Sequence, residues 1–226
     1  MTPPTFERAR SAEAKRVRET AILEAATLLA TERGVRPVTL TDIAAAVGMH
    51  KSAMLRYFET REEIFLRLSA NAWTEWSTDV RNQLDRLHRH RPTADGASAG
   101  ISAVAAVLAD TLVARPLFCD LLAHTPLNLE RGVSFAAVKS FKLTAIAEAK
   151  AVSAALSAIL PLTAAQAGDA VATATAMAGA LWQMAAPGTE LRGFYEETPE
   201  LAHAVVDVGP RLTDILTALL RGYCAG

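Results

Sequence analysis

The segment at residues 40–58, LTDIAAAVGMHKSAMLRYF, constrains the fold most, because two short apolar patterns meet there at a glycine. Ala44 is small at the position where two helices would cross closely. Gly48 follows four residues later, where a tight turn favours a positive φ. The positions that need inward-facing side chains carry Leu40, Ile43, Val47, Met49, Met54 and Tyr57. The segment therefore predicts two short helices, 40–47 and 50–57, in a helix-turn-helix arrangement.

The rest of the chain is also expected to be helical. About a fifth of the 226 residues are alanine, and strand-like alternation is scarce. Alanine and leucine form helices readily and are poor in strands, which predicts an all-α protein. Apolar spacing and capping residues predict about nine helices. Their expected ranges are 12–33, 40–47, 50–57, 61–88, 98–114, 116–124, 132–159, 164–186 and 199–222, the last broken at Gly209-Pro210.

Two regions are expected from this order of helices. Residues 1–62 would hold an N-terminal arm and a three-helix DNA-binding domain that contains the helix-turn-helix. A long fourth helix would join them to a C-terminal helical bundle in residues 63–226, after a loop at 89–100. Residues 1–91 carry 15 Lys and Arg against 12 Asp and Glu, whereas residues 92–226 carry 8 against 12. A basic front half is compatible with binding a polyanion.

The second short helix presents an outward face that is suited to the DNA major groove. If Met54 and Tyr57 point inward, the pairs Lys51/Leu55 and Ser52/Arg56 point outward at i, i+4 spacing. Lysine and arginine donate to guanine or to phosphates, leucine contacts a thymine methyl, and serine bonds a base or the backbone. Three alternatives remain open: Lys51 is solvated only, His50 only caps the helix, or Leu55 packs on the neighbouring helix.

The segment from Val17 to Leu68 resembles the DNA-binding domain of TetR/AcrR-type transcriptional repressors. The resemblance rests on Ile-Leu-x-Ala-Ala at 22–26, Gly34, Thr39 before Ile43-Ala44, Gly48, Phe58 and Arg61. It covers about the first 70 residues. The remaining residues match the family only as an all-helical domain of the right size.

This resemblance implies roles for individual residues. Thr39 and Thr41 are expected at a phosphate or an adjacent base, and His50 and Lys51 at bases. Tyr57 is expected to bind phosphate, as is Arg61 together with the backbone at the start of the fourth helix. The chain departs from the usual family pattern in having His50 in place of serine and Leu55 in place of tyrosine, so its operator is expected to differ. Repression is likewise implied by the resemblance.

The back half is expected to pair two subunits, because one helix-turn-helix covers only half of a pseudo-palindromic operator. Small and apolar residues on 164–186 and 199–222 would form a four-helix bundle between two copies. The expected interface residues are Val171, Ala174, Ala178, Leu181, Leu212, Ile215, Leu216, Leu219 and Leu220. The alternative is that these faces are buried within one subunit.

The back half is also expected to hold a hydrophobic small-molecule effector. Helices 98–114, 116–124, 132–159 and 164–186 would enclose a pocket beside helix 61–88. The expected lining residues are Leu112, Phe118, Leu121, Leu122, Phe135, Phe141, Met177 and Trp182. Effector binding would shift helix 61–88, which carries the helix-turn-helix, and release the operator.

Other function classes find little support. Ser-His-Asp order, HExxH spacing and a phosphate-binding glycine loop are missing, so no enzyme is expected. Cys119 and Cys224 fit no metal motif, and neither a metal nor a cofactor is expected. The start lacks a signal-peptide core and no run reaches about 18 apolar residues, so we expect a cytoplasmic protein without a membrane segment. The alternative functions are a helical small-molecule carrier or enzyme without DNA binding, or an interaction protein that keeps the motif as scaffold.

Overall fold

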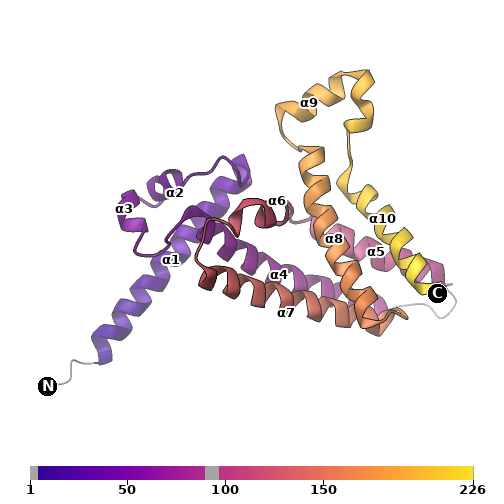
Figure 1. Ribbon diagram of the computed structural model, residues 1–226, viewed down its shortest axis with the longest axis horizontal. Coiled ribbons are helices and arrows are strands. Elements are labelled where there is room, and N and C mark those ends of the chain that lie inside the picture. The colour runs from indigo at the N-terminus through magenta and orange to yellow at the C-terminus, as the bar shows by residue number, and fades with distance from the viewer. Residues whose placement is uncertain (1–4, 90–96, 226) are drawn as a thin grey trace.

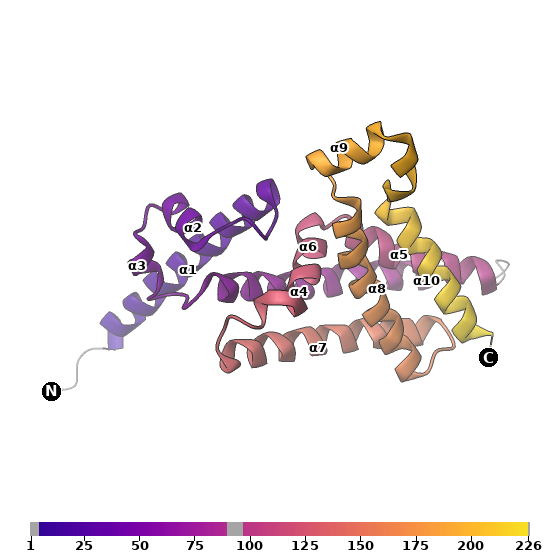
Figure 2. The same cartoon turned by 45° about the horizontal axis from the view of Figure 1, so that its top comes forward.

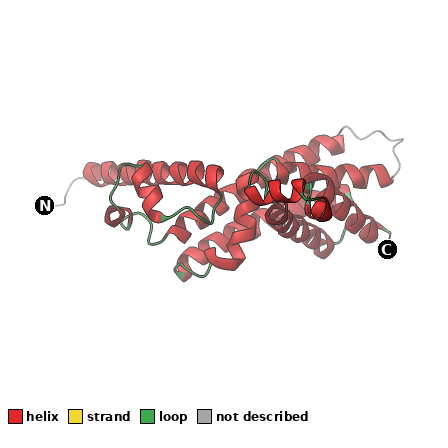
Figure 3. Ribbon diagram, turned by 90° about the horizontal axis from the view of Figure 1, so that it is seen from above, coloured by secondary structure: helices red, strands yellow, loops and turns green. Residues whose placement is uncertain are grey.

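The computed structural model describes residues 5–89 and 97–225, and within these ranges every regular element is a helix (Figure 3). The all-α prediction is confirmed. The α-helices are α1 Thr5–Arg33, α2 Leu40–Ala46, α3 Lys51–Met54, α4 Arg61–Arg89, α5 Ala97–Val113, α6 Pro116–His124, α7 Phe135–Ile159, α8 Ala164–Ala185, α9 Glu190–Glu197 and α10 Val208–Cys224. A π-helix at Thr125–Leu129 and a 3₁₀-helix at Pro199–Ala204 complete the set.

The helices form two groups that α4 connects (Figures 1 and 2). The head consists of α1, α2 and α3. The body consists of α5 to α10, and α4 runs from the head into the body, where it lies along α7. In the body, α8 packs on α6 and α7, and α10 packs on α5 and α8. The helix α4 is thus the element that connects the head to the body.

The head is held by its apolar residues and by local capping. Ile43 and Met54 are fully buried, and Gly48 has the left-handed φ of 65° that the turn requires. Thr39 caps α2, because its Oγ1 accepts from the Asp42 backbone N at 3.2 Å while Asp42 Oδ2 accepts from the Thr39 backbone N at 2.8 Å. This reciprocal capping satisfies two backbone donors at the start of α2.

The last expected helix, 199–222, differs most from the structure. Its start is the separate 3₁₀-helix, and the continuous helix α10 begins only at Val208. Gly209-Pro210 therefore does not break a helix but lies in the first turn of one, where a missing N–H costs no intrahelical hydrogen bond. The sequence did not lead us to expect helix α9. The loop expected at 89–100 falls largely on residues 90–96, outside the described residues.

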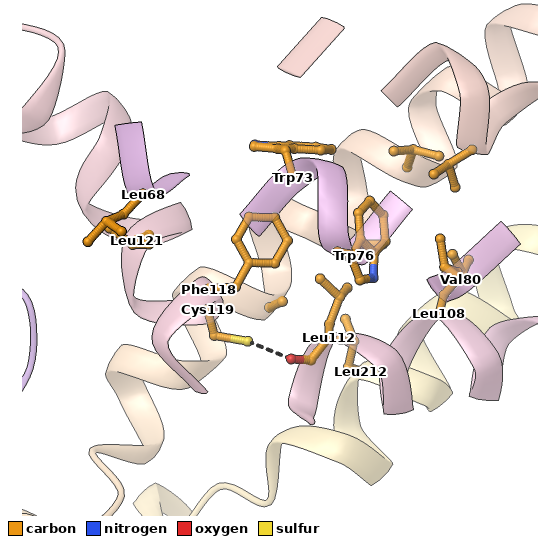
Figure 4. Close-up of a cluster of buried hydrophobic side chains, with 14 of the residues drawn as sticks. Leu68, Trp73, Trp76, Val80, Leu108, Leu112, Phe118, Cys119, Leu121 and Leu212 are labelled. Carbon is orange, nitrogen blue, oxygen red and sulfur yellow. Dashed lines mark hydrogen bonds between the residues drawn. The ribbon is translucent and has the colours of Figure 1, made fainter. Parts of the chain in front are cut away.

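The core of the body centres on three aromatic side chains (Figure 4). Trp73 of α4 lies edge-on to Trp76 and to Phe118 of α6, with ring centroids 5.5 and 5.6 Å apart. The buried Trp76 Nε1 donates to Thr111 Oγ1 of α5 at 3.0 Å, so its polar atom is satisfied. These contacts pack α4, α5 and α6 against one another in the core.

Two charged side chains hold the head against the body at Val35, in the loop between α1 and α2. The Asp120 carboxylate of α6 accepts from the Val35 backbone N at 2.6 Å and from Gln183 Nε2 of α8 at 2.7 Å. On the other side, the Arg61 guanidinium at the start of α4 donates to the backbone carbonyls of Val35 and Val38. We call this group the Val35 junction.

The charge of Asp120 is stabilised where it lies. Burial raises its pKa, but hydrogen bonds from His124, Val35 and Gln183 and the charge of His124 outweigh that effect and hold the pKa below its ordinary value. His124 Nε2 lies 3.3 Å from Asp120 Oδ1 on the same helix. Asp120 is therefore an ionised carboxylate that three segments share.

We expect Gly179→Ala to destabilise the protein, because α6 and α8 touch there. An added Cβ would lie 2.8 Å from the backbone N of Ala123, and backbone atoms cannot turn aside as a flexible side chain can. The expected loss is about 1–3 kcal/mol of unfolding free energy in a urea titration. Gly168→Ala on the same helix meets open space and should be neutral or gain up to about 1 kcal/mol. Equal stability of the two variants would contradict this packing.

We expect Asp120→Asn to lose about 1–3 kcal/mol of unfolding free energy at pH 7, because an amide cannot accept from every donor around it. The pKa of Asp120 is lower in the folded than in the unfolded protein, so its ionised carboxylate stabilises the fold at pH values above about 3.9, the unfolded pKa of aspartate. This stabilisation is lost as the pH falls through the folded pKa. The gap between wild type and variant should therefore narrow below about pH 4. Unfolding titrations from pH 7 to pH 3 measure it, and a gap independent of pH would contradict the role given to the carboxylate.

Candidate nucleic-acid interface and effector cavity

The outward face of α3 and of the turn that follows it lies open to solvent. Lys51, Ser52, Leu55 and Arg56 are all exposed, with 53% of Leu55 accessible, whereas Met54 between them is fully buried. We call these four exposed residues the recognition ridge. Leu55 does not pack on a neighbouring helix, which removes one alternative left open by the sequence. The ridge offers two cations, a hydroxyl and an apolar tip, which are groups that contact phosphates, base edges and thymine methyls.

His50 is the N-cap of α3. Its Nδ1 accepts from the Ser52 backbone N at 3.3 Å and lies 2.8 Å from Ser52 Oγ. Both residues remain exposed, so they flank the start of the ridge as a bonded pair. The helix α3 ends at Met54, earlier than expected, and Tyr57 lies beyond it, partly buried against the head.

The other expected DNA-contacting residues lie in different settings. Thr41 is exposed at the start of α2, and Thr39 is exposed but engaged in capping. Arg61 is 17% exposed, and its guanidinium bonds the loop carbonyls at Val35 and Val38 as well as Glu62. The carbonyls between α1 and α2 have no helical partner, and Arg61, for which the resemblance implied a phosphate contact, satisfies them in the structure.

A cavity of about 480 Å³ opens in the body between α4, the π-helix, α7 and α8. Its wall includes Trp73, Leu122, Phe141 and Val171, and its polar lining residues include Glu130, Lys142 and Lys150. We call it the effector cavity. The volume falls within the range of small-molecule sites, about 300–1,000 Å³. It lies beside α4 and has walls from α6, α7 and α8, whereas none of the described lining residues comes from α5, which was also expected to enclose the pocket.

Of the eight expected lining residues, the structure places Leu122 and Phe141 on the effector cavity. Leu112 lies fully inside the core instead, and Met177 is partly buried without lining this cavity. Phe135 is 93% exposed, because it begins α7 directly after the Ser134 N-cap and nothing packs over that end. The expectation was wrong for these three residues.

Three further expected lining residues face other hollows. Phe118 and Leu121 border a hollow of about 760 Å³ between α1, α4 and α6. Trp182 borders one of about 340 Å³ beside the Val35 junction. The apolar periodicity of a helix marks which side is buried but not which neighbour covers it, and that difference explains all of these corrections.

The expected subunit interface is also corrected. Seven of its nine side chains are buried within a single chain, and only Ile215 and Leu219 are partly accessible. The buried ones are Val171, Ala174, Ala178, Leu181, Leu212, Leu216 and Leu220. The reason is intramolecular packing, since α10 lies on α5 and α8 and covers its own apolar stripe there. The alternative that these faces are buried within one subunit holds for those seven residues.

Sequence reasoning missed the polar residues of the body that matter most for geometry. Asp120, His124 and Gln183 meet at the Val35 junction although they lie on two helices far apart in sequence. A lone aspartate in the apolar run PLFCDLL of α6 was the one signal available. Cys119 beside it is buried, and burial raises the pKa of its thiol to about 12, so it stays protonated at neutral pH.

The described residues carry no cluster of three or more His, Cys, Asp or Glu side chains with metal-binding geometry. Within the same ranges, no single helix has the length and apolar character needed to cross a membrane. One helix pair, Ala99–Val113 with Pro116–Leu129, reaches that length and composition only together, with a bend of 87° between them.

Two family models match the chain, and together they cover most of it. The model of bacterial regulatory proteins of the tetR family matches residues 22–68, which include α2, α3 and the start of α4. The model of the tetracyclin repressor-like C-terminal domain matches residues 70–226, more than half of the chain. No curated protein matches the sequence.

Several solved structures share the fold at low sequence identity. The fatty acid degradation regulator FadR from Bacillus halodurans is 13% identical, with a TM-score of 0.51 over 88% of this chain and 97% of that one. A TetR/AcrR-family regulator from Thermobifida fusca is 19% identical, with a TM-score of 0.50 over 91% and 98%. The regulator PfmR from Thermus thermophilus is 17% identical, with a TM-score of 0.51 over 88% and 97%. At these low identities, the similarity shows a shared fold.

The matched segments coincide with the features built up above. The tetR-family match contains the recognition ridge and its supporting turn, and the C-terminal match contains the effector cavity. The chain therefore belongs to the TetR family and is a ligand-responsive, DNA-binding transcriptional regulator.

Proposed function

We propose that the protein is a repressor that binds a pseudo-palindromic operator as a dimer and is released by a mainly hydrophobic small molecule. The observation that carries the proposal is the recognition ridge, four exposed side chains held over a buried Met54. The name of the C-terminal family model, tetracyclin repressor-like, supports repression. A repressor of this kind would act in the cytoplasm, where its operator DNA is.

At the operator, the ridge would lie in the major groove. Lys51 and Arg56 donate to guanine edges or phosphates, Ser52 to a base or the backbone, and Leu55 contacts a thymine methyl. The exposed Thr41, His50 and the partly buried Tyr57 flank the ridge and would add backbone contacts. Thr39 would contact the DNA with its side chain still engaged in capping α2.

For the dimer, we propose the outward sides of α8 and α10 in place of the buried residues first expected. On α8, Ala180 and Met184 are exposed, and on α10 Ile215 and Leu219 are partly accessible. Ala180 allows close approach of a second copy, and the three larger side chains supply apolar surface to bury against it. Two heads would then face half-sites about 34–36 Å apart, or a multiple of that distance.

For release, we propose that α4 and α6 connect the cavity with the head. Trp73 of α4 and Leu122 of α6 line the effector cavity, and the same two helices hold Val35 through Arg61 and Asp120. The boundary between residues 1–62 and 63–226 falls at the start of α4, beside this junction. An effector that favours a different spacing of α4 and α6 would shift the heads by its differential affinity for the two arrangements.

The replacement of Lys51 and Arg56 by alanine tests DNA binding. Binding of wild type to random duplex DNA should weaken steeply with salt, because phosphate contacts release counterions. Each variant should reduce the slope of log K against log[salt] by about 1 if that side chain contacts a phosphate. Fluorescence anisotropy over a salt series measures the slope.

Arg211→Ala is the matched control, since Arg211 is exposed on α10, away from the head. It should leave the slope as in wild type. A carrier or an enzyme without DNA binding would show a shallow slope that neither Lys51→Ala nor Arg56→Ala changes, and this result would refute the proposed function.

Ala180→Arg tests the dimer surface. A charged side chain at this exposed position of α8 would be desolvated in the proposed contact, so the variant should dissociate to monomers that remain helical. Sedimentation velocity measures the mass, and circular dichroism measures the helix content. Ala147→Arg, on an exposed position of α7, should leave the dimer intact. A dimer that tolerates Ala180→Arg would exclude this surface.

A further inference from the structure

We propose that the effector cavity selects an amphipathic anion, whose apolar body fills the cavity and whose charged group lies at Lys150 on the rim. This inference rests on the proposed function, in which the cavity is the effector site. It names the chemistry of the ligand: an ionised carboxylate or similar monoanion attached to a hydrocarbon or aromatic body. The inner wall, its hydroxyl groups and the rim each bear on this choice.

The inner wall of the cavity is apolar. On α7, Phe141, Ala145 and Ala149 recur every four residues and form one row that faces the cavity. Trp73 of α4 and Val171 of α8 lie on other sides of it. Such a wall favours a ligand body of hydrocarbon or aromatic character, because burying apolar surface is the main gain available there.

The hydroxyl groups in the lining do not change this character. Thr125, Ser153 and Thr175 each donate to a carbonyl one turn earlier in the chain, over 2.7, 2.8 and 3.0 Å. A hydroxyl has a single hydrogen, so none of the three has one left for a ligand. The wall therefore offers acceptors at most, and a ligand whose polar atoms need donors must find them elsewhere.

The rim supplies the donors. Lys142, Ile146 and Lys150 form a second row on α7, next to the apolar row and at the same four-residue spacing. Lys142 Nζ pairs with Glu130 Oε1 at 2.7 Å. Lys150 is exposed, and within the described residues no hydrogen bond or ion pair engages its ammonium group. The charged lining residues are thus two lysines against one glutamate.

This charge balance decides between ligand classes. An ammonium group without a counter-charge beside an apolar wall attracts an anion, is indifferent to a neutral alcohol and repels a cation. Lysine makes charge-assisted hydrogen bonds with carboxylates, which are stronger than neutral ones. The anionic group of the ligand is therefore expected at Lys150. Lys142 could donate a second hydrogen bond to it while remaining paired with Glu130.

Three probes with the same alkyl chain and different head groups test the inference: decanoate, decan-1-ol and decyltrimethylammonium. Isothermal titration calorimetry of the full-length protein at pH 7.5 measures their affinities, and the loss of a change in tryptophan emission in Trp73→Phe reports that the probe occupies the cavity that Trp73 lines. Decanoate should bind at least about tenfold more tightly than decan-1-ol, which is about 1.4 kcal/mol. Decyltrimethylammonium should bind most weakly.

Variants assign the effect to the rim. Lys150→Gln should weaken decanoate at least about tenfold and leave decan-1-ol within about twofold, because only the charge-dependent contact is removed. Lys139→Gln is the matched control, since Lys139 lies on α7 and does not line the cavity. It should leave all three affinities unchanged.

Equal affinity for decanoate and decan-1-ol would overturn the inference, as would an equal loss of both in Lys150→Gln. The absence of a calorimetric signal from all three probes would overturn it too. The proposed function is tested separately, by measuring DNA affinity over the salt series with and without each probe. Release by decan-1-ol as efficient as release by decanoate would refute the anionic ligand and leave the ligand-released repressor standing.

Discussion

The two backbone hydrogen bonds of Val35 determine how the DNA-binding head lies on the body. Its N–H donates to the Asp120 carboxylate of α6, and its carbonyl accepts from Arg61 of α4. The backbone of a loop between helices needs partners because it has no helical ones. Here those partners come from the two helices that lead into the body, so the head has a defined orientation.

This arrangement connects the two sites of the molecule through rigid elements. The aromatic contacts of Trp73, Trp76 and Phe118 join α4 to α6, and Trp73 also lines the effector cavity. A ligand in this cavity that favours a different spacing of α4 and α6 would shift both helices. The wall helices are those that hold Val35, which is why we place the coupling between effector and operator there.

Local features of the head could be predicted from the sequence because their causes are local. The positive φ of Gly48, the capping of α2 at Thr39 and the burial of Met54 with Lys51 and Arg56 outside follow from residue type and helical spacing. The role of Arg61 could not be predicted in this way. Its partners lie more than twenty residues away and become neighbours only when α4 folds back under the loop.

From the amino-acid sequence alone one could predict that the chain is helical, where the turns of the head lie and which side of most helices is apolar. Tertiary structure alone decided what covers each apolar side: Leu212 and Leu216 meet their own chain, and Phe135 meets solvent. The hydrophobic effect is non-directional, so a periodic apolar stripe predicts which side of a helix is buried but not which element covers it. The cavity and its lysine rim likewise arise only where α7 and α8 lie side by side.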